Sequence, residues 1–177
     1  MTARLDQRTV VVVDHMDVDL GAVPILEAHE PPGLLHRAVS VCLIDPKGRL
    51  VLQQRAEAKS HFARRWSNAC CTHPEPGEHP EQAASRRTLE ELGLVAPPLT
   101  YVGSFVYHAA DPESGLTEHE LDHVFVGVTD SEPRPCRAEV MDWRYAYTDE
   151  LHLGDTAETR YTPWLGRVVS LALSGRP

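Results

Sequence analysis

The stretch EQAASRRTLEELG at residues 81–93 decides the fold that the sequence predicts. Residues 81–92 have helix-forming composition, and Gly93 stands where a helix commonly ends, because glycine adopts the left-handed conformation of a C-terminal cap without strain. A loop rich in proline and glycine, residues 72–80, precedes the helix. We therefore expect a helix entered from a loop, with strands before and after it.

Short apolar and β-branched runs predict the strands. These runs are residues 10–13, 36–44, 50–54, 100–107, 118–129 and 140–147, with a loop at 111–115 between the fourth and the fifth. The turn Asp45–Gly48 predicts that the second and third runs form a hairpin. A last helix is expected near Thr162, with Pro163 in its first turn. This order is typical of an α/β (α+β) fold in which mixed β-sheets pack between helices.

Composition limits the kind of protein. The 177 residues suffice for one domain, 1–177, and 42% are hydrophobic. A net charge of −9 argues against a nucleic-acid partner. The sequence has neither a signal-like start nor a membrane-spanning apolar run, so we expect a cytoplasmic protein with no membrane partner. The four cysteines lack paired spacing and should be reduced, and no heptad demands a partner, so we expect a monomer.

Two short patterns place chemical groups on a common side. Glu118 and Glu120 are two positions apart in EHELDHVF, so in a strand both carboxylates point to the same face. A solvated strand face is the commoner explanation of such a pair. Cys71 and His73 have the same spacing, and here the alternative is a buried structural cysteine beside a loop histidine.

The histidines suggest a metal site. His29 and His36 flank EPPGLL, in which two prolines and a glycine would fold the chain back and bring both rings together. With His73 and the two glutamates they would form a nitrogen and oxygen shell suited to zinc, manganese or iron(II). Spacing alone does not establish a set drawn from three distant segments.

The helix carries charges of both signs. Arg86 and Arg87 lie one turn before Glu90 and Glu91. Intrahelical ion pairs would add only about 0.2–0.5 kcal/mol each, and arginine before glutamate is the poorer orientation. Carboxylates for a divalent ion and an arginine for a bound phosphate explain both signs. A basic group that follows the predicted hairpin is either solvated surface or a contact for an anionic substrate; its members are Arg55, Lys59, Arg64 and Arg65.

Four motifs occur together in a familiar order: LLHRAVSV at 34–41, SNACCTHP at 67–74, RRTLEELG at 86–93 and GLTEHELD at 115–122. Together they resemble the type 1 isopentenyl-diphosphate isomerases of the Nudix superfamily, over residues 29–164. The resemblance implies a Nudix-type fold. It also implies interconversion of isopentenyl and dimethylallyl diphosphate by protonation and deprotonation through a carbocation-like state.

The resemblance also implies residue roles. Positions matching the family's transition-metal site (Mn, Zn or Fe) are His29, His36, His73, Glu118 and Glu120. Cys71 matches its catalytic thiol, and Glu120 matches an acid and base group as well as a metal ligand. Tyr107 matches an aromatic position around the prenyl group, from which it can help to protonate the alkene. Positions matching its contacts with the prenyl diphosphate are Arg55, Lys59, Arg87 and Trp164, and Glu91 matches the ligand of a magnesium ion carried by that diphosphate.

The helix resembles a degenerate Nudix box. Thr72 replaces its usual glycine, and Arg87 stands where a Nudix hydrolase has glutamate, whereas Glu78, Glu90 and Glu91 keep their places. The resemblance therefore favours a diphosphate-holding helix over a hydrolytic metal cluster. A Nudix hydrolase of another diphosphate and a catalytically silent metal-binding module remain the alternatives.

One position departs from the family pattern. Ile25 stands where many members have lysine, which removes a phosphate contact. Weaker binding, compensation by Arg64 or His61, or a modified substrate would each follow. The segment 1–28, with its N-terminal strand, is our candidate for part of a lid over the site.

Overall fold

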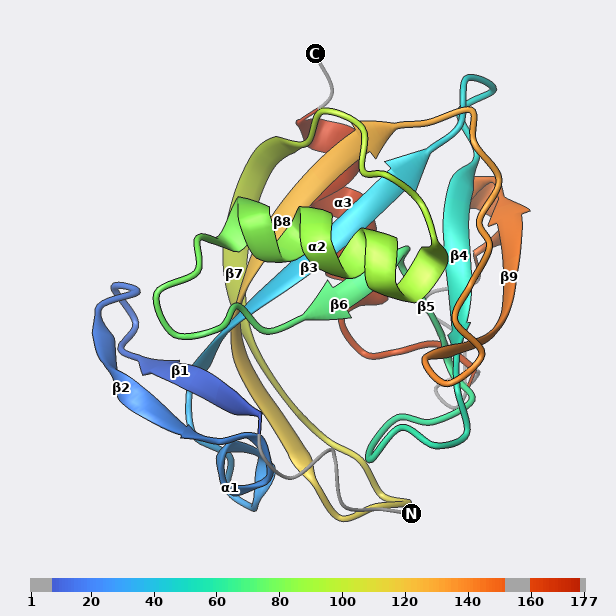
Figure 1. Cartoon of the computed structure of the whole chain (residues 1–177). Coiled ribbons are helices and arrows are strands. Elements are labelled where there is room, and N and C mark those ends of the chain that lie inside the picture. Colours follow the sequence, from blue (N-terminus) through green and yellow to red (C-terminus); the bar gives the residue numbers. More distant parts are fainter. Residues whose placement is uncertain (1–7, 152–159, 176–177) are drawn as a thin grey trace.

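The computed structural model describes residues 8–151 and 160–175, and it places a mixed sheet between two helices (Figure 1). The strands are β1 (Thr9–Val13), β2 (Asp19–Pro24), β3 (His36–Ile44), β4 (Leu50–Arg55), β5 (Trp66–Ser67), β6 (Cys70–Thr72), β7 (Thr100–Ala110), β8 (Thr117–Val128) and β9 (Val140–Ala146). The helices are α1 (Ile25–His29), α2 (Pro80–Leu92) and α3 (Leu165–Ser174), with a 3₁₀ turn at Thr148–Glu150. Within the described ranges, no helix has the length and apolar character needed to cross a bilayer.

Strand β3 is the centre of the sheet. It pairs in parallel with β8 along its whole length, from His36 opposite Glu120 to Ile44 opposite Val128. On its other edge β6 pairs antiparallel at residues 39–41, and β7 continues the sheet beyond β8. Strand β4 carries β5 and β9 (Figure 1), while β1 and β2 form a hairpin beside α1.

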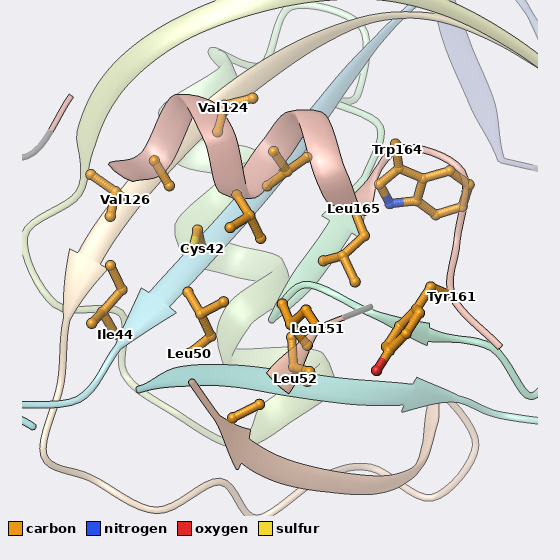
Figure 2. Packing of buried hydrophobic residues seen from close by; sticks show 14 of the residues in the cluster. Cys42, Ile44, Leu50, Leu52, Val124, Val126, Leu151, Tyr161, Trp164 and Leu165 are labelled. Atoms are coloured by element: carbon orange, nitrogen blue, oxygen red, sulfur yellow. The ribbon is translucent and has the colours of Figure 1, made fainter. Parts of the chain in front are cut away.

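Side-chain alternation along β3 divides the two faces of the sheet. Val39, Val41 and Leu43 pack with residues of α2. Cys42 and Ile44 belong to the cluster around α3, which Figure 2 shows. Successive strand residues point to opposite faces, so the other even-numbered positions of β3 also face α3.

The same alternation selects between the two adjacent cysteines. Cys70 is buried in the cluster beneath α2, whereas Cys71 packs against the cluster on the α3 side. On β8, Val124 belongs to the α3 cluster, so Glu118 and Glu120 lie on that face as well. One end of the α3 face thus collects polar side chains beside an apolar core.

The predicted fold class is confirmed, and the predicted central helix begins one residue earlier, at Pro80. The predicted hairpin was wrong in detail: β3 and β4 pair only at Ile44 and Leu50, because β6 occupies the edge of β3 and β4 pairs along its length with β9. The last helix begins at Leu165 with Trp164 as its N-cap, so Pro163 precedes the helix instead of lying in its first turn.

The C-terminal end of α2 is closely packed. Gly93 has a φ of 64°, and its N–H donates to the carbonyl of Leu89 at 2.9 Å. The following segment covers the helix end, since the N–H of Arg134 donates to the carbonyl of Leu92 at 2.7 Å. A Cβ at position 93 would lie 2.5 Å from the carbonyl oxygen of Arg134. This packing fixes the helix turn that carries Glu91.

We predict that Gly93→Ala destabilises the protein more than Gly48→Ala. Both positions have positive φ, at 64° and 82°, which costs an alanine about 1–2 kcal/mol. A Cβ at position 48 meets nothing within 4 Å, whereas at position 93 it collides with backbone. Urea unfolding of the two variants measures the difference in free energy, and equal losses would show that the collision is relieved without cost.

Candidate active site

Five side chains from four segments form one cluster on the α3 face of the sheet. They come from α1, β3, the end of β6 and β8: His29, His36, His73, Glu118 and Glu120. One ligand atom of each lies within 4.8 Å of those of all the others. All are buried except His73, which is partly exposed. The structure therefore brings together the complete set that the sequence suggested for a metal.

Backbone carbonyls orient two of the rings. Nδ1 of His29 lies 2.7 Å from the carbonyl oxygen of Ile25, and Nδ1 of His36 lies 2.7 Å from that of Leu34. A carbonyl only accepts, so each Nδ1 carries a hydrogen and each Nε2 is directed at the cluster. Nε2 of His36 lies only 3.2 Å from Nε2 of His73. Two imidazole nitrogens this close need a hydrogen or a metal ion between them, and this donor set fits a divalent ion.

The cluster shifts the pKa values of its members in opposite directions. Burial opposes protonation of His29, but the hydrogen bond and charge of Glu118 outweigh it and raise its pKa to about 8. Burial lowers the pKa of His73 to about 4, although Glu120 acts the other way. Burial would raise the pKa of Glu118, but the charge of His61 and the bond from His29 hold it well below its usual value.

The thiol of Cys71 lies in a polar cradle. Four groups surround its sulfur: Nε1 of Trp164 at 3.0 Å, Oδ1 of Asn68 at 3.2 Å, and the hydroxyls of Ser40 and Ser67 at 3.6 Å each. The indole N–H donates to the sulfur, and the amide oxygen accepts the thiol hydrogen. Burial, with the nearby carboxyl of Asp122, raises the pKa of Cys71 to about 12. The thiol is therefore protonated at neutral pH.

The carboxylate of Glu120 lies at the boundary between the cluster and a small cavity. Tyr107 donates its hydroxyl hydrogen to Oε2 of Glu120 at 2.5 Å, and His73 lies 2.7 Å from Oε1. Cys71, Tyr107, Glu120 and Trp164 all line this cavity of about 70 Å³. A thiol and a carboxylate thus lie on the wall of one buried space.

The predicted diphosphate contacts line the same cavity. The guanidinium of Arg55 is buried, donates to the carbonyls of His61 and Phe62, and among the described residues forms no ion pair with a carboxylate. Lys59 and Arg87 are already paired: Lys59 contacts Glu139, and Arg87 lies 2.6 Å from Glu91. Arg55 therefore lines this cavity with a charge that no carboxylate of the described residues neutralises.

A second cavity, of about 370 Å³, adjoins the first and shares residues with it. Arg8 and Ile25 line both cavities, and the N–H of Ile25 donates to the carbonyl of Arg8 at 2.9 Å. Our sequence analysis missed Arg8, because only the pairing of β1 with the unpredicted strand β2 places it at the site. That pairing sets Thr9 opposite Pro24.

The remaining basic residues of the predicted group lie elsewhere. Arg64 is exposed, pairs with Glu57 and Glu113, and lines neither cavity. Arg65 is buried and lies 3.8 Å from Asp111. His61 does line the inner cavity, but both of its ring nitrogens have partners within the protein. Of the two residues considered as compensation for Ile25, neither has a free group directed to a diphosphate.

A NUDIX domain family model matches residues 34–167. The isopentenyl-diphosphate Delta-isomerase of Nocardia farcinica (strain IFM 10152) is 49% identical over 164 residues, which cover 92% of this chain and 93% of that protein. The chain belongs to this Nudix family. The protein of the same name from Streptomyces coelicolor is 45% identical, over 91% of this chain and 81% of that protein. The one from Halorhodospira halophila is 41% identical, over 90% of this chain and 92% of that protein.

Solved structures share the Nudix fold of this family member. The DR0079 protein from Deinococcus radiodurans superposes with a TM-score of 0.75 at 18% identity, over 93% of this chain and 99% of that one. A MutT protein from Methanosarcina mazei gives 0.64 at 17% identity, over 81% and 96%. At these identities the likeness shows the fold alone.

The Nudix box helix of this family member holds its charges in two groups. Arg86 binds Glu78 through two hydrogen bonds of 2.7 Å, which ties the helix to the preceding loop. Arg87 contacts Glu90 and Glu91 at 2.7 and 2.6 Å. The helix therefore contains the intrahelical ion pairs that the sequence analysis considered as the alternative to a functional role. Arg87, however, also lines the inner cavity, so its ion pairs lie at the site.

We predict that the metal-free protein is most stable near pH 6.5 within the range 4–8. The raised pKa of His29, about 8, gives stability that is present below 6.5 and is lost as pH rises through 8. The lowered pKa of His73, about 4, gives stability that is present above 6.5 and is lost as pH falls toward 4. Each change should be on the order of 1–3 kcal/mol.

Urea unfolding of chelator-treated protein across this range measures the effect. Glu118→Gln is the matched control, because it removes the charge that raises the pKa of His29 and should flatten the alkaline limb. Stability that climbs steadily from pH 6.5 to 8 would contradict the prediction.

Proposed function

We propose that this protein interconverts isopentenyl diphosphate and dimethylallyl diphosphate. The observation that carries the proposal is the placing of Cys71 and Glu120 on the wall of one small buried cavity, in opposite protonation states. The names of the relatives at 41–49% identity support the same reaction.

The reaction moves a double bond by adding one proton to an alkene carbon and removing another from an allylic carbon. Burial keeps the thiol of Cys71 protonated, as described above. Burial and Glu118 oppose ionisation of Glu120, but bonds from His36 and His73 lower its pKa. When Cys71 donates a proton, Glu120 can accept one, and the reverse reaction exchanges these roles. Tyr107, which donates to Glu120, positions that carboxylate and can take part in the transfer.

The metal is part of the proposal. We propose that manganese, zinc or iron(II) occupies the cluster of three imidazoles and two carboxylates. Such an ion, when bound, supplies positive charge that keeps Glu120 ionised and in place. The proposal is supported by the orientation of His29 and His36, whose Nε2 atoms are directed at the cluster because backbone carbonyls hold Nδ1.

The diphosphate is assigned to the cations of the inner cavity, Arg55, Lys59 and Arg87. Lys59 and Arg87 are neutralised by carboxylates in this structure, so a substrate with several negative charges needs further positive charge. We propose that magnesium bound with the diphosphate provides it and contacts Glu91. Glu91 is buried and already lies among these cations.

The aromatic wall suits a carbocation-like state. The ring of Trp164 lies 5.7 Å from that of Tyr107 and 5.4 Å, edge to face, from that of Phe62. An aromatic face stabilises a desolvated cation by roughly 0.5–2 kcal/mol. Water must be kept away, and we propose that the N-terminal segment contributes to closure, since Arg8 and Ile25 line both cavities. Residues 1–7 of that segment lie outside the described residues.

The rival functions are less well supported. A Nudix hydrolase of another diphosphate would lack the carboxylate that Arg87 replaces. Neither it nor a catalytically silent metal-binding module explains a cradled thiol that shares a cavity with Glu120. We further propose that the enzyme is a cytoplasmic monomer of one domain, without nucleic-acid or membrane partners. The net charge of −9 supports the absence of a nucleic-acid partner.

We predict that the protein, loaded with metal and incubated with isopentenyl diphosphate and Mg²⁺ in heavy water, forms deuterated dimethylallyl diphosphate. Cys71→Ala should lower kcat by about 10²–10⁴-fold, the usual contribution of a positioned proton-transfer group. Its metal content should not change, because the thiol is not among the clustered ligand atoms. Cys136→Ala, a change at an exposed cysteine, is the control and should behave as the parent. Release of phosphate without rearranged product would reject the isomerase assignment.

We predict that Arg8→Gln raises KM for the diphosphate substrate by about 5- to 50-fold with little change in kcat, the scale of one charge-assisted contact of 1–2 kcal/mol. Arg8 lines both cavities and, among the described residues, has no ion-pair partner. Arg64→Gln removes an equal charge from the surface and is the matched control. Equal KM values for the two variants would exclude Arg8 from substrate binding.

A further inference from the structure

We propose that His61 is a sixth residue of the metal site, which holds one oxygen of Glu118 so that the carboxylate presents its other oxygen to the ion. The inference rests on the metal site of the proposed function and adds a residue that the five clustered ligands do not include. It concerns how the site binds its ion, and it can be tested without the isomerase reaction.

The two oxygens of Glu118 have different partners. Nε2 of His61 lies 2.7 Å from Oε1, and Nε2 of His29 lies 3.0 Å from Oε2. The rings of His61 and His29 are tilted against each other with centroids 4.6 Å apart. His61 is 8% exposed and Glu118 is 3% exposed, so water competes little for this contact. Four imidazoles therefore gather here, and the fourth reaches the cluster through a carboxylate.

The hydrogen-bond pattern places a hydrogen on Nε2 of His61. A carboxylate oxygen accepts, and Oε1 of Glu118 lies 2.7 Å from this nitrogen. Nδ1 of His61 lies 2.9 Å from the hydroxyl of Ser60, which can donate to it or accept from it. The ring thus directs an N–H, and no lone pair, toward the cluster. It acts on Glu118 as a donor and is not itself arranged as a ligand.

The loop that carries His61 is held firmly. Arg55 donates to the carbonyls of both His61 and Phe62 at 3.0 Å. The N–H of Phe62 donates to Oδ2 of Asp111 at 2.9 Å, and the Phe62 ring packs in the core against Trp164. Hydrogen bonds to the backbone and the packing of Phe62 in the core therefore set the position of His61, and with it the hydrogen bond between His61 and Glu118.

Holding Oε1 of Glu118 has a defined consequence for the ion. A free carboxylate can use one or both oxygens, whereas this one has Oε1 engaged and Oε2 beside His29. Residues that orient a metal ligand through a hydrogen bond typically contribute about 10–100-fold to affinity. His61 should therefore contribute to metal affinity while leaving the set of ligand atoms unchanged.

The test uses Co²⁺ as the probe, because its visible absorption reports the ligand atoms. Affinity is measured by competition with a chromophoric chelator on chelator-treated protein. We expect His61→Phe and His61→Ala to weaken Co²⁺ binding about 10–100-fold with the absorption bands in place. His61→Gln, which retains an N–H donor at a similar reach, should recover most of the affinity.

The control is His123→Gln on the same strand as Glu118. His123 also pairs with a carboxylate, Asp17, at 3.0 Å, but it is not among the clustered ligands. This variant should bind Co²⁺ as the parent does, and circular dichroism with thermal melting establishes that each variant is folded.

Three results would overturn the proposal. Parent-like affinity in both His61→Phe and His61→Ala would show that the contact with Glu118 is only structural. A loss beyond about 10³-fold with altered absorption bands would make His61 a direct ligand, since that exceeds the effect of a supporting hydrogen bond. If the parent protein binds no Co²⁺, the proposed metal site is rejected together with the role of His61. The heavy-water assay then tests separately whether the protein catalyses the isomerisation.

Discussion

The in-register parallel pairing of β3 with β8 is the constraint on which the site depends. It sets His36 opposite Glu120 and continues without a shift to the ends of both strands. A slip of one residue would turn every side chain of one strand to the other face. Glu118 and Glu120 would then lie beneath α2 while His36 stayed on the α3 side. Apolar alternation on β8 prevents this slip, because Val124 and Val126 must remain in the α3 cluster and Phe125 in the cluster beneath α2.

At the proposed diphosphate end of the site, two of the cations are already paired with carboxylates. Lys59 and Arg87 are held by Glu91 and Glu139, so these long side chains are already oriented before a substrate arrives. A bound anion must then either displace carboxylates or bring cations with it. Arg55 differs from them, because its guanidinium donates to backbone carbonyls, which carry no net charge. In the proposed function, its charge would therefore be available to the diphosphate.

How much of this the sequence could predict depends on the range of the interactions. The period of a strand sufficed to place Glu118 and Glu120 together, and glycine chemistry sufficed to end α2 at Gly93. The predicted hairpin of 36–44 with 50–54 pairs only next to its turn, at Ile44 and Leu50, because β6, a strand of three residues, occupies the same edge of β3. No local pattern reports such competition.

The places of Arg8 and His61 in the site could not be predicted from local sequence, because long-range contacts determine both. Strand β2, which brings Arg8 to the site through its pairing with β1, is mostly exposed and lacks the apolar alternation that marks a strand. The contact of His61 with Glu118 spans 57 residues and exists only because Arg55 and Asp111 anchor the intervening loop. Neither residue belongs to a motif, so only the folded arrangement assigns it a place.

The site is built from the core, and this has a thermodynamic cost that the metal can offset. Trp164 is 2% exposed and packs beside α3, yet its indole N–H donates to Cys71 and Ser67. Beside it, Nε2 of His36 and Nε2 of His73 approach to 3.2 Å, which requires a hydrogen or an ion between them. In the metal-free protein, a proton on His29 supplies positive charge beside Glu118. An ion that replaces this proton would satisfy all the converging groups at once, so binding of the metal and stability of the fold should be coupled.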